Sequence, residues 1–155
     1  MNDLTHLDDA GHAHMVDVAA RPVTTRTATA SGRVTTSAAG LIRSGLVPKG
    51  DVLAVARIAG IMATKRTPDL IPLCHPIAVH GVEVEVAAAE TTDEVLIRAT
   101  VRTADRTGVE MEALTAVAVA GLAVIDMVKA VDPHAALRDV QVEAKDGGRN
   151  GAWRR

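Results

Sequence analysis

Alternating apolar and polar positions mark a hairpin in the middle of the chain. In residues 81–89 valines alternate with glutamates, and in residues 94–104 apolar side chains alternate with Arg98, Thr100 and Arg102. Successive side chains of a strand point to opposite faces of its sheet, so each segment predicts a strand with one apolar and one polar face. The short ETTD segment between them predicts a tight connection. Glutamates and arginines can then pair across the two strands.

Longer apolar segments predict helices. Residues 51–65 begin with Asp51, a preferred N-cap, and are apolar enough that we expect most of the helix surface to be buried. Residues 110–132 predict the longest helix. A shorter helix is expected up to Gly45, with Thr36 or Ser37 as its N-cap. Three further segments have strand-like composition or alternation: 14–19, 23–37 and 136–145.

The order of these elements is strands, two helices, two strands, a helix and a strand. It predicts an α+β fold, a ferredoxin-like two-layer sandwich in which an antiparallel sheet carries helices on one face. The 155 residues fit a single domain, residues 1–155. Residues 1–13 and 146–155 are polar or rich in glycine, and we expect them to be flexible.

The composition limits the partners. The chain has no Phe or Tyr and one Trp, so small aliphatic residues build the core, and we expect further surface to be buried between copies of the chain in a homo-oligomer. A net charge of −2 and the lack of aromatic residues argue against a nucleic acid polymer as partner. The acidic N-terminal segment, the single cysteine and the absence of an uncharged run of ~20 apolar residues predict a cytoplasmic protein without a membrane partner.

The segment DLIPLCHPI, residues 69–77, contains the only cysteine, Cys74, next to His75. Adjacent residues rarely both reach one metal ion, and no second Cys or HxxxH pattern supports them, so we expect no metal site. Cys74 is better interpreted as a buried or pocket-wall residue than as a nucleophile. His75 is a candidate acid or base, because histidine side chains in general change charge near neutral pH, although a packing role remains open.

Several charged residues have both a structural and a functional interpretation. Lys49 lies just before a predicted helix start, where phosphate oxygens are favoured, whereas Lys65 and Arg66 follow a helix end, where cations complement the dipole. Asp126 and Lys129 interrupt an apolar stretch at i and i+3. They form either an acid–base pair or a surface ion pair.

The long helix adds a geometric expectation. Glu112 and Asp126 are fourteen residues apart, which corresponds to about 21 Å along the axis, so one chain cannot bring both to one small substrate. If both are functional at one site, a second chain must supply one of them. Antiparallel helices in a two-fold dimer meet this requirement.

These segments together resemble the cyclic pyranopterin monophosphate synthase family, the molybdenum cofactor biosynthesis protein C family. The resemblance rests on LTHLD and HMVDV near the start, KGDVLAVARIAGIMATKRTPDLIPLCHPI, TGVEMEALTAVAVAGLAVIDMVKAVD and KDGGRNG. It implies conversion of 3′,8-cyclo-7,8-dihydroguanosine 5′-triphosphate to cyclic pyranopterin monophosphate with release of pyrophosphate. It also implies a hexamer, a trimer of dimers, with the site at a dimer interface.

The resemblance also implies site residues. Catalytic roles fall to Asp126, Lys129 and Lys49, and substrate binding to Leu73, Cys74, His75, Met111, Glu112, Arg26, Lys65 and Arg66. Lys145 matches a further basic position. Arg149 stands where the family pattern leads us to expect a lysine, which keeps the charge but removes a proton donor. No cofactor is implied, and Mg²⁺ would enter only with the substrate phosphates.

Two other functions remain open from the sequence. One is a non-catalytic oligomeric module of ferredoxin-like fold that binds a nucleotide or another small anion. The other is a scaffold that assists the enzyme making the cyclised intermediate. Both would bind without turnover, so pyrophosphate release distinguishes them from a synthase.

Overall fold

The computed structural model describes residues 6–149 and 151–155, and it contains one antiparallel sheet in the strand order β2-β3-β1-β4-β5. The strands are β1 (Thr24–Thr35), β2 (Val79–Ala88), β3 (Glu94–Asp105), β4 (Ala136–Asp146) and β5 (Trp153–Arg154). The helices are α1 (Ala39–Ser44), α2 (Val52–Thr64), α3 (Thr67–Leu70) and α4 (Glu110–Val128). The predicted α+β, ferredoxin-like arrangement is confirmed.

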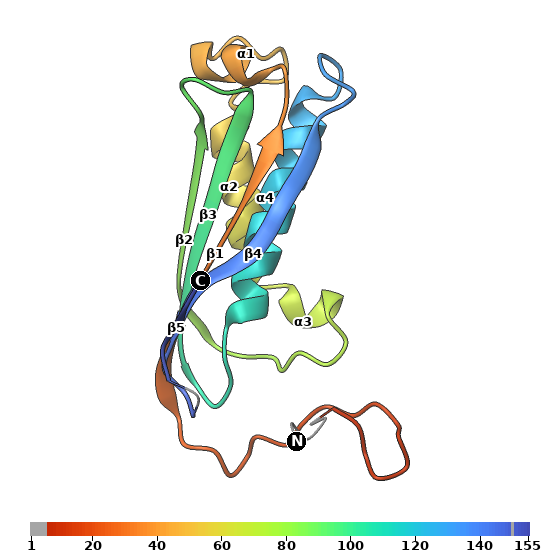
Figure 1. Cartoon of the computed structure of the whole chain (residues 1–155), viewed down its shortest axis with the longest axis vertical. Helices are drawn as coiled ribbons and strands as arrows, with labels where there is room; N and C mark the ends of the chain where they lie inside the picture. Colours follow the sequence, from red (N-terminus) through yellow and green to blue (C-terminus); the bar gives the residue numbers. More distant parts are fainter. Residues whose placement is uncertain (1–5, 150) are drawn as a thin grey trace.

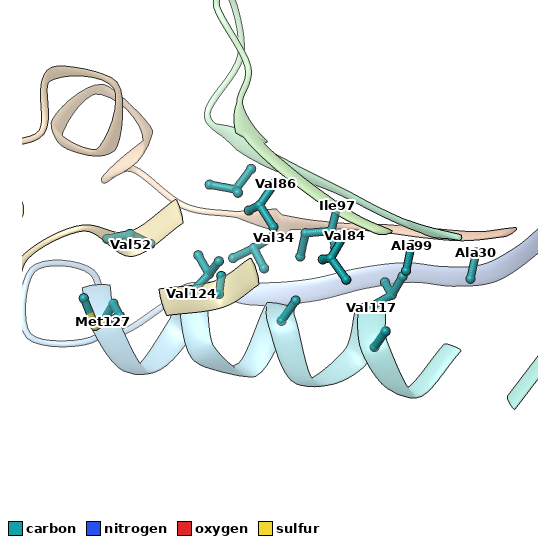
Figure 2. Close-up of a cluster of buried hydrophobic side chains, with 14 of the residues drawn as sticks. Ala30, Val34, Val52, Val84, Val86, Ile97, Ala99, Val117, Val124 and Met127 are labelled. Carbon is teal, nitrogen blue, oxygen red and sulfur yellow. The ribbon is translucent and has the colours of Figure 1, made fainter. Parts of the chain in front are cut away.

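Helices α2 and α4 lie side by side on one face of the sheet (Figure 1). The core between the layers consists mainly of Val and Ala; Val34, Val117 and Val124 are fully buried (Figure 2). At Gly60 the helices approach so closely that an added Cβ would lie 2.9 Å from the carbonyl oxygen of Ala116. The small residues that dominate the composition therefore permit close helix packing.

The predicted hairpin is confirmed, although only one of its two glutamates lies opposite an arginine. Strands β2 and β3 are antiparallel, and Glu85 lies opposite Arg98 while Glu83 lies opposite Thr100. The valines of β2 and the apolar side chains of β3 point toward the helices, and the charged side chains occupy the other face. Alternation along the sequence thus corresponds directly to the two faces of the sheet.

The predicted helix ends are partly confirmed. Asp51 caps α2, because its Oδ1 accepts a hydrogen bond of 2.9 Å from the backbone N–H of Ala54. Gly45 ends α1 in the left-handed conformation, with φ 69°. The predicted N-cap of α1 was wrong: Ala38 holds this position, and the Thr36 hydroxyl instead donates to Asp132 at 2.7 Å.

Three other predictions of secondary structure and burial were wrong. Residues 14–19 form no strand, and α4 ends at Val128 rather than at residue 132. Helix α2 is less buried in the single chain than expected, since Ile58 and Met62 are 58% and 62% exposed. Strand β5, which pairs Trp153 with Lys145 of β4, was not predicted.

The remaining structural predictions concern mobility and membranes. The expected flexibility of residues 1–13 and 146–155 stays a prediction, and residues 1–5 lie outside the described residues. By length and composition alone, α4 could cross a membrane. Its apolar side chains pack against the sheet, as those of a core helix do.

Candidate functional site

A cavity of about 270 Å³ lies at the beginning of α4. We call it the Glu112 cavity. It is lined by His6, Val16, Val18, Arg21, Leu73, Cys74, His75, Thr107, Gly108, Glu110, Met111 and Glu112. Five of the predicted substrate-binding residues therefore come together here: two from the first turn of α4, and three from the loop that follows α3.

Glu112 is the unusual residue of this cavity, because it is only 3% exposed and its carboxyl has no cation paired with it among the ion pairs of the described residues. Burial raises the pKa of Glu112 to about 7, and the charge of the nearby Glu110 carboxylate adds to the rise, while a backbone hydrogen bond opposes it. Burial also raises the pKa of the Cys74 thiol, and the charge of Glu112 raises it further. Cys74 is thus a neutral thiol at physiological pH, consistent with a pocket-wall residue rather than a nucleophile.

His75 contacts the N-terminal segment. Its ring Nε2 lies 2.6 Å from the carbonyl oxygen of Val16, so Nε2 carries the proton and donates this hydrogen bond. The other ring nitrogen, Nδ1, is then an acceptor in the neutral ring. His75 both lines the cavity and attaches residues 16–18 to its rim.

A second cavity of about 160 Å³ adjoins the first, and we call it the basic cavity. Its charged lining residues are Arg21, Arg26, Lys145, Arg149, Glu110 and Asp146, so cations outnumber acids by four to two. The Nζ of Lys145 lies 3.0 Å from Oε1 of Glu110. Arg21, Gly108 and Glu110 line both cavities, which are therefore neighbours at these residues.

Two glycines at the end of β4 shape the basic cavity. Gly147 and Gly148 have φ of 85° and 81°, a conformation that other residues rarely adopt. An added Cβ on Gly148 would lie 2.4 Å from Nη1 of Arg26. Arg26 also donates from Nε to the carbonyl oxygen of Asp105 at 3.0 Å. Because Gly148 has no Cβ, the turn at Gly147 and Gly148 leaves room for the Arg26 guanidinium beside the backbone of Gly148.

The predicted catalytic residues form a separate group, the Asp126 cluster, which consists of Lys49, Asp126 and Lys129. The carboxylate of Asp126 lies 2.7 Å from Nζ of Lys129 and 3.2 Å from Nζ of Lys49. Lys49 also donates to the backbone carbonyl of Asp126 at 2.6 Å. The hydrogen bonds from Lys129 and Lys49, in that order, hold the pKa of Asp126 below its usual value.

The two groups lie at opposite ends of α4. Figure 1 shows the start of α4 near α3, and its last turns at the other end of the molecule, near α1. Lys65 and Arg66 lie in neither group. They line a wide apolar groove on the α2–α4 side with Ala59, Met62, Ala63, Leu70 and Val119. A single chain therefore does not bring all the predicted site residues together.

Sequence reasoning missed several residues that line the cavities, among them Glu110 and Arg21. Arg21 lies before β1, outside every segment that we interpreted as functional, yet it lines both the Glu112 cavity and the basic cavity. A basic residue just before a proline is the only local signal. Its position becomes evident only when the chain folds back toward α4.

Known proteins resemble this chain along nearly its whole length. Residues 15–148 match the model of the MoaC family. The cyclic pyranopterin monophosphate synthase of Streptomyces griseus is 65% identical over 156 aligned residues, which cover 99% of this chain and 87% of that protein. The synthases of Nocardioides sp. and Thermomicrobium roseum are 61% and 57% identical, covering 98% and 100% of this chain and 95% of each relative. The chain therefore belongs to the MoaC family.

Proposed function

We propose that this chain is an enzyme of molybdenum cofactor biosynthesis that converts 3′,8-cyclo-7,8-dihydroguanosine 5′-triphosphate to cyclic pyranopterin monophosphate and pyrophosphate. The main support for this proposal is sequence similarity: the chain is 65% identical to a cyclic pyranopterin monophosphate synthase over 99% of its length. Such high similarity over the full length extends through both cavities and the Asp126 cluster. We expect the enzyme to act in the cytoplasm.

The two adjoining cavities suit the two chemically different ends of this substrate. The Glu112 cavity offers a buried carboxyl, which can accept hydrogen bonds from the N–H groups of the guanine-derived ring. The basic cavity offers Arg26 and Lys145 to the triphosphate. An excess of cations in this one cavity attracts phosphate although the protein as a whole has a net charge of −2.

The proposed catalytic groups are Lys129 and Lys49, with Asp126 between them. Proton transfers accompany ring opening and pyranopterin closure, and a lysine held in place by a carboxylate can donate or accept such protons. The geometry supports this role, because Asp126 contacts both ammonium groups within 3.2 Å. His75 is a second acid–base candidate through Nδ1, since its Nε2 is already bound to Val16.

The complete site requires two chains in this proposal. The surface of α2 and α4 between the two groups carries exposed apolar side chains, among them Ile58, Met62 and Leu122. Burial of this surface against a second copy, with the α4 helices antiparallel, would place one Asp126 cluster beside the partner's Glu112 cavity. Lys65 and Arg66 lie on the same surface, where they could reach a substrate bound between the chains. We propose further that three such dimers form a hexamer.

The proposal includes no resident cofactor. Mg²⁺ would be held by the phosphate oxygens of the substrate, as it often is in nucleotide enzymes. Within residues 6–149 and 151–155, no group of three or more His, Cys, Asp or Glu side chains is placed to hold a metal ion.

Incubation of the purified chain with the cyclised dihydro-GTP intermediate tests this function. We expect stoichiometric release of pyrophosphate and formation of cyclic pyranopterin monophosphate, with GTP as the control substrate that yields neither. Binding of the intermediate without pyrophosphate release would instead support a non-catalytic binding module. Pyrophosphate release only when the upstream radical enzyme is also present would support a scaffold.

A further inference from the structure

The loop between α3 and β2, residues 71–78, forms one wall of the Glu112 cavity and carries Cys74 and His75. Its first half is fixed locally, because the N–H of Cys74 donates to the carbonyl of Ile71 at 3.1 Å. Of the three residues that follow Cys74, only His75 forms a hydrogen bond within the described part of the chain, to the carbonyl of Val16. The path of the second half therefore depends on how the loop joins the sheet.

The end of this loop is held on both sides of one residue, Ala78. The hydroxyl of Thr103 donates to the Ala78 carbonyl at 2.5 Å, and the Ala78 N–H donates to Oδ2 of Asp105 at 3.3 Å. We call Thr103 and Asp105 the Ala78 clamp. Between them, the N–H of Ala104 donates to Nδ1 of His80 at 3.3 Å. The last three residues of β3 thus hold the chain where the loop becomes β2.

Thr103 interrupts the apolar pattern of β3. The other residues of this strand that face the helices are aliphatic: Val95, Ile97, Ala99 and Val101. Thr103 occupies the next position of the same face and is only 2% exposed. Valine has nearly the same shape and would continue the pattern, whereas a buried hydroxyl costs free energy unless it is hydrogen-bonded. The bond to Ala78 therefore accounts for a threonine at this position.

The end of β3 is connected to both walls of the Glu112 cavity. The pairing of β2 with β3 shifts by one residue at His80, which forms a β-bulge beside the Ala78 clamp. Beyond the clamp, residues 106–109 lead from Asp105 to Glu110, the first residue of α4. The clamp thus fixes the loop wall relative to the helix wall. Thr103 itself lines neither the Glu112 cavity nor the basic cavity.

We propose that Thr103, assisted by Asp105, is a positioning residue: it holds the loop so that Cys74 and His75 lie against Glu112. The effect on turnover rests on the proposed function, whereas the place of the loop is a property of the chain itself. Cys74 reports this place, because it is the only cysteine. Burial raises the pKa of its thiol, and the charge of Glu112 raises it further, so a loop that moves away from Glu112 lowers that pKa.

Three substitutions separate the clamp from a general loss of packing. Thr103→Val removes the hydroxyl, Thr103→Ser keeps it, and Thr100→Val is the matched control. Thr100 lies on the same strand, its hydroxyl is 3.1 Å from that of Thr29, and it lines neither cavity. For Thr103→Val we expect kcat/KM for the intermediate to fall about tenfold or more, since small displacements of site residues reduce rates strongly. Thr103→Ser and Thr100→Val should stay close to wild type.

Alkylation of Cys74 by iodoacetamide as a function of pH tests the place of the loop without turnover. Only the thiolate reacts, so the midpoint of the profile follows the pKa of the thiol. We expect a lower midpoint in Thr103→Val and the wild-type midpoint in Thr103→Ser and Thr100→Val. This result would support the clamp even if wild type released no pyrophosphate. A wild-type midpoint in Thr103→Val, with or without loss of activity, would overturn it, and so would an equal shift in Thr100→Val.

Asp105→Ala provides a second test, in case thermal unfolding shows that Thr103→Val is not folded. It removes the other contact of Ala78, on the exposed side. We expect the midpoint of Cys74 alkylation to fall in this variant as well. An unchanged midpoint in folded Asp105→Ala would then contradict the proposed positioning.

Discussion

The Nζ of Lys129 lies 2.7 Å from Oδ1 of Asp126, one turn earlier on α4. Lys49 contacts the other carboxylate oxygen at 3.2 Å, so one ionised carboxylate holds two ammonium groups. In a single chain this arrangement faces solvent, and surface ion pairs stabilise proteins little. We therefore expect its importance to lie in the reaction rather than in folding.

Lys129→Arg tests this expectation. Arginine keeps the positive charge but does not release its proton at physiological pH. If Lys129 transfers a proton, pyrophosphate release should fall by about 100-fold or more, the usual magnitude for loss of a general acid or base. The free energy of unfolding should change by less than about 1 kcal/mol. Retention of most of the activity would show that Lys129 contributes only charge.

Asp126→Asn tests the positioning role of the carboxylate. The amide keeps the size of the side chain but loses the charge that holds both lysines, and we expect kcat to fall while KM changes less. The pH dependence of kcat should also change, because the variant lacks the Asp126 carboxylate, whose pKa the two lysines hold below its usual value. An unchanged pH profile with a reduced kcat would point to a purely structural effect.

Glu112 predicts a pH dependence of stability. Its pKa is raised from 4.5 to about 7 in the folded protein, so between these values the folded state binds more protons than the unfolded state. Stability then falls as the pH rises through this range, and the loss is complete above about pH 7. The full shift corresponds to about 3 kcal/mol as an upper value.

Glu112→Gln removes this titration and keeps a similar shape. In denaturant unfolding at fixed protein concentration, we expect the variant to be more stable than wild type at pH 8, with the difference shrinking toward pH 5. Glu83→Gln, on the exposed face of β2, is the matched control and should show no such trend. A Glu112→Gln variant that is less stable at pH 8 would contradict the raised pKa.

The glycines after β4 give a prediction about the basic cavity. Ala at position 148 would meet the guanidinium of Arg26 and adopt a positive φ of 81°. Gly151→Ala suffers the same kind of backbone strain, at φ 65°, with no atoms within 4 Å. We expect each variant to lose about 1–3 kcal/mol of stability. Only Gly148→Ala should raise KM for the intermediate, and equal KM values in both variants would exclude a role for the Arg26 contact.

Local sequence patterns predict the layers of this fold well. The alternation in β2 and β3 predicts which side chains share a face of the sheet, as Glu85 and Arg98 do. Residues 14–19 show the same alternation but form no strand, because no neighbouring strand edge pairs with them in the fold. Strand β5 is the opposite case. Its two residues show no strand-like pattern in the sequence, and the strand forms because the turn at Gly147 and Gly148 reverses the chain direction so that it pairs with β4.

The site is less predictable from local patterns. The start of α4 is evident from the sequence, but only the tertiary structure shows that the loop holding Cys74 and His75 lies against its first turn. The contact of His75 with Val16 and the place of Arg21 depend on how an irregular segment crosses the cavity. Hydrophobic periodicity carries no information about such segments.

We propose that each site combines the Glu112 cavity of one chain with the Asp126 cluster of another. Mixing the inactive variants Glu112→Ala and Lys129→Ala under conditions of subunit exchange tests it most directly. In a mixed dimer one site regains both residues and the other loses both, so random pairing should restore about a quarter of wild-type pyrophosphate release. A mixture of Lys129→Ala with Asp126→Ala, whose lesions lie in the same cluster, should stay inactive. No recovery in the first mixture, with exchange verified by mass spectrometry, would contradict the shared site.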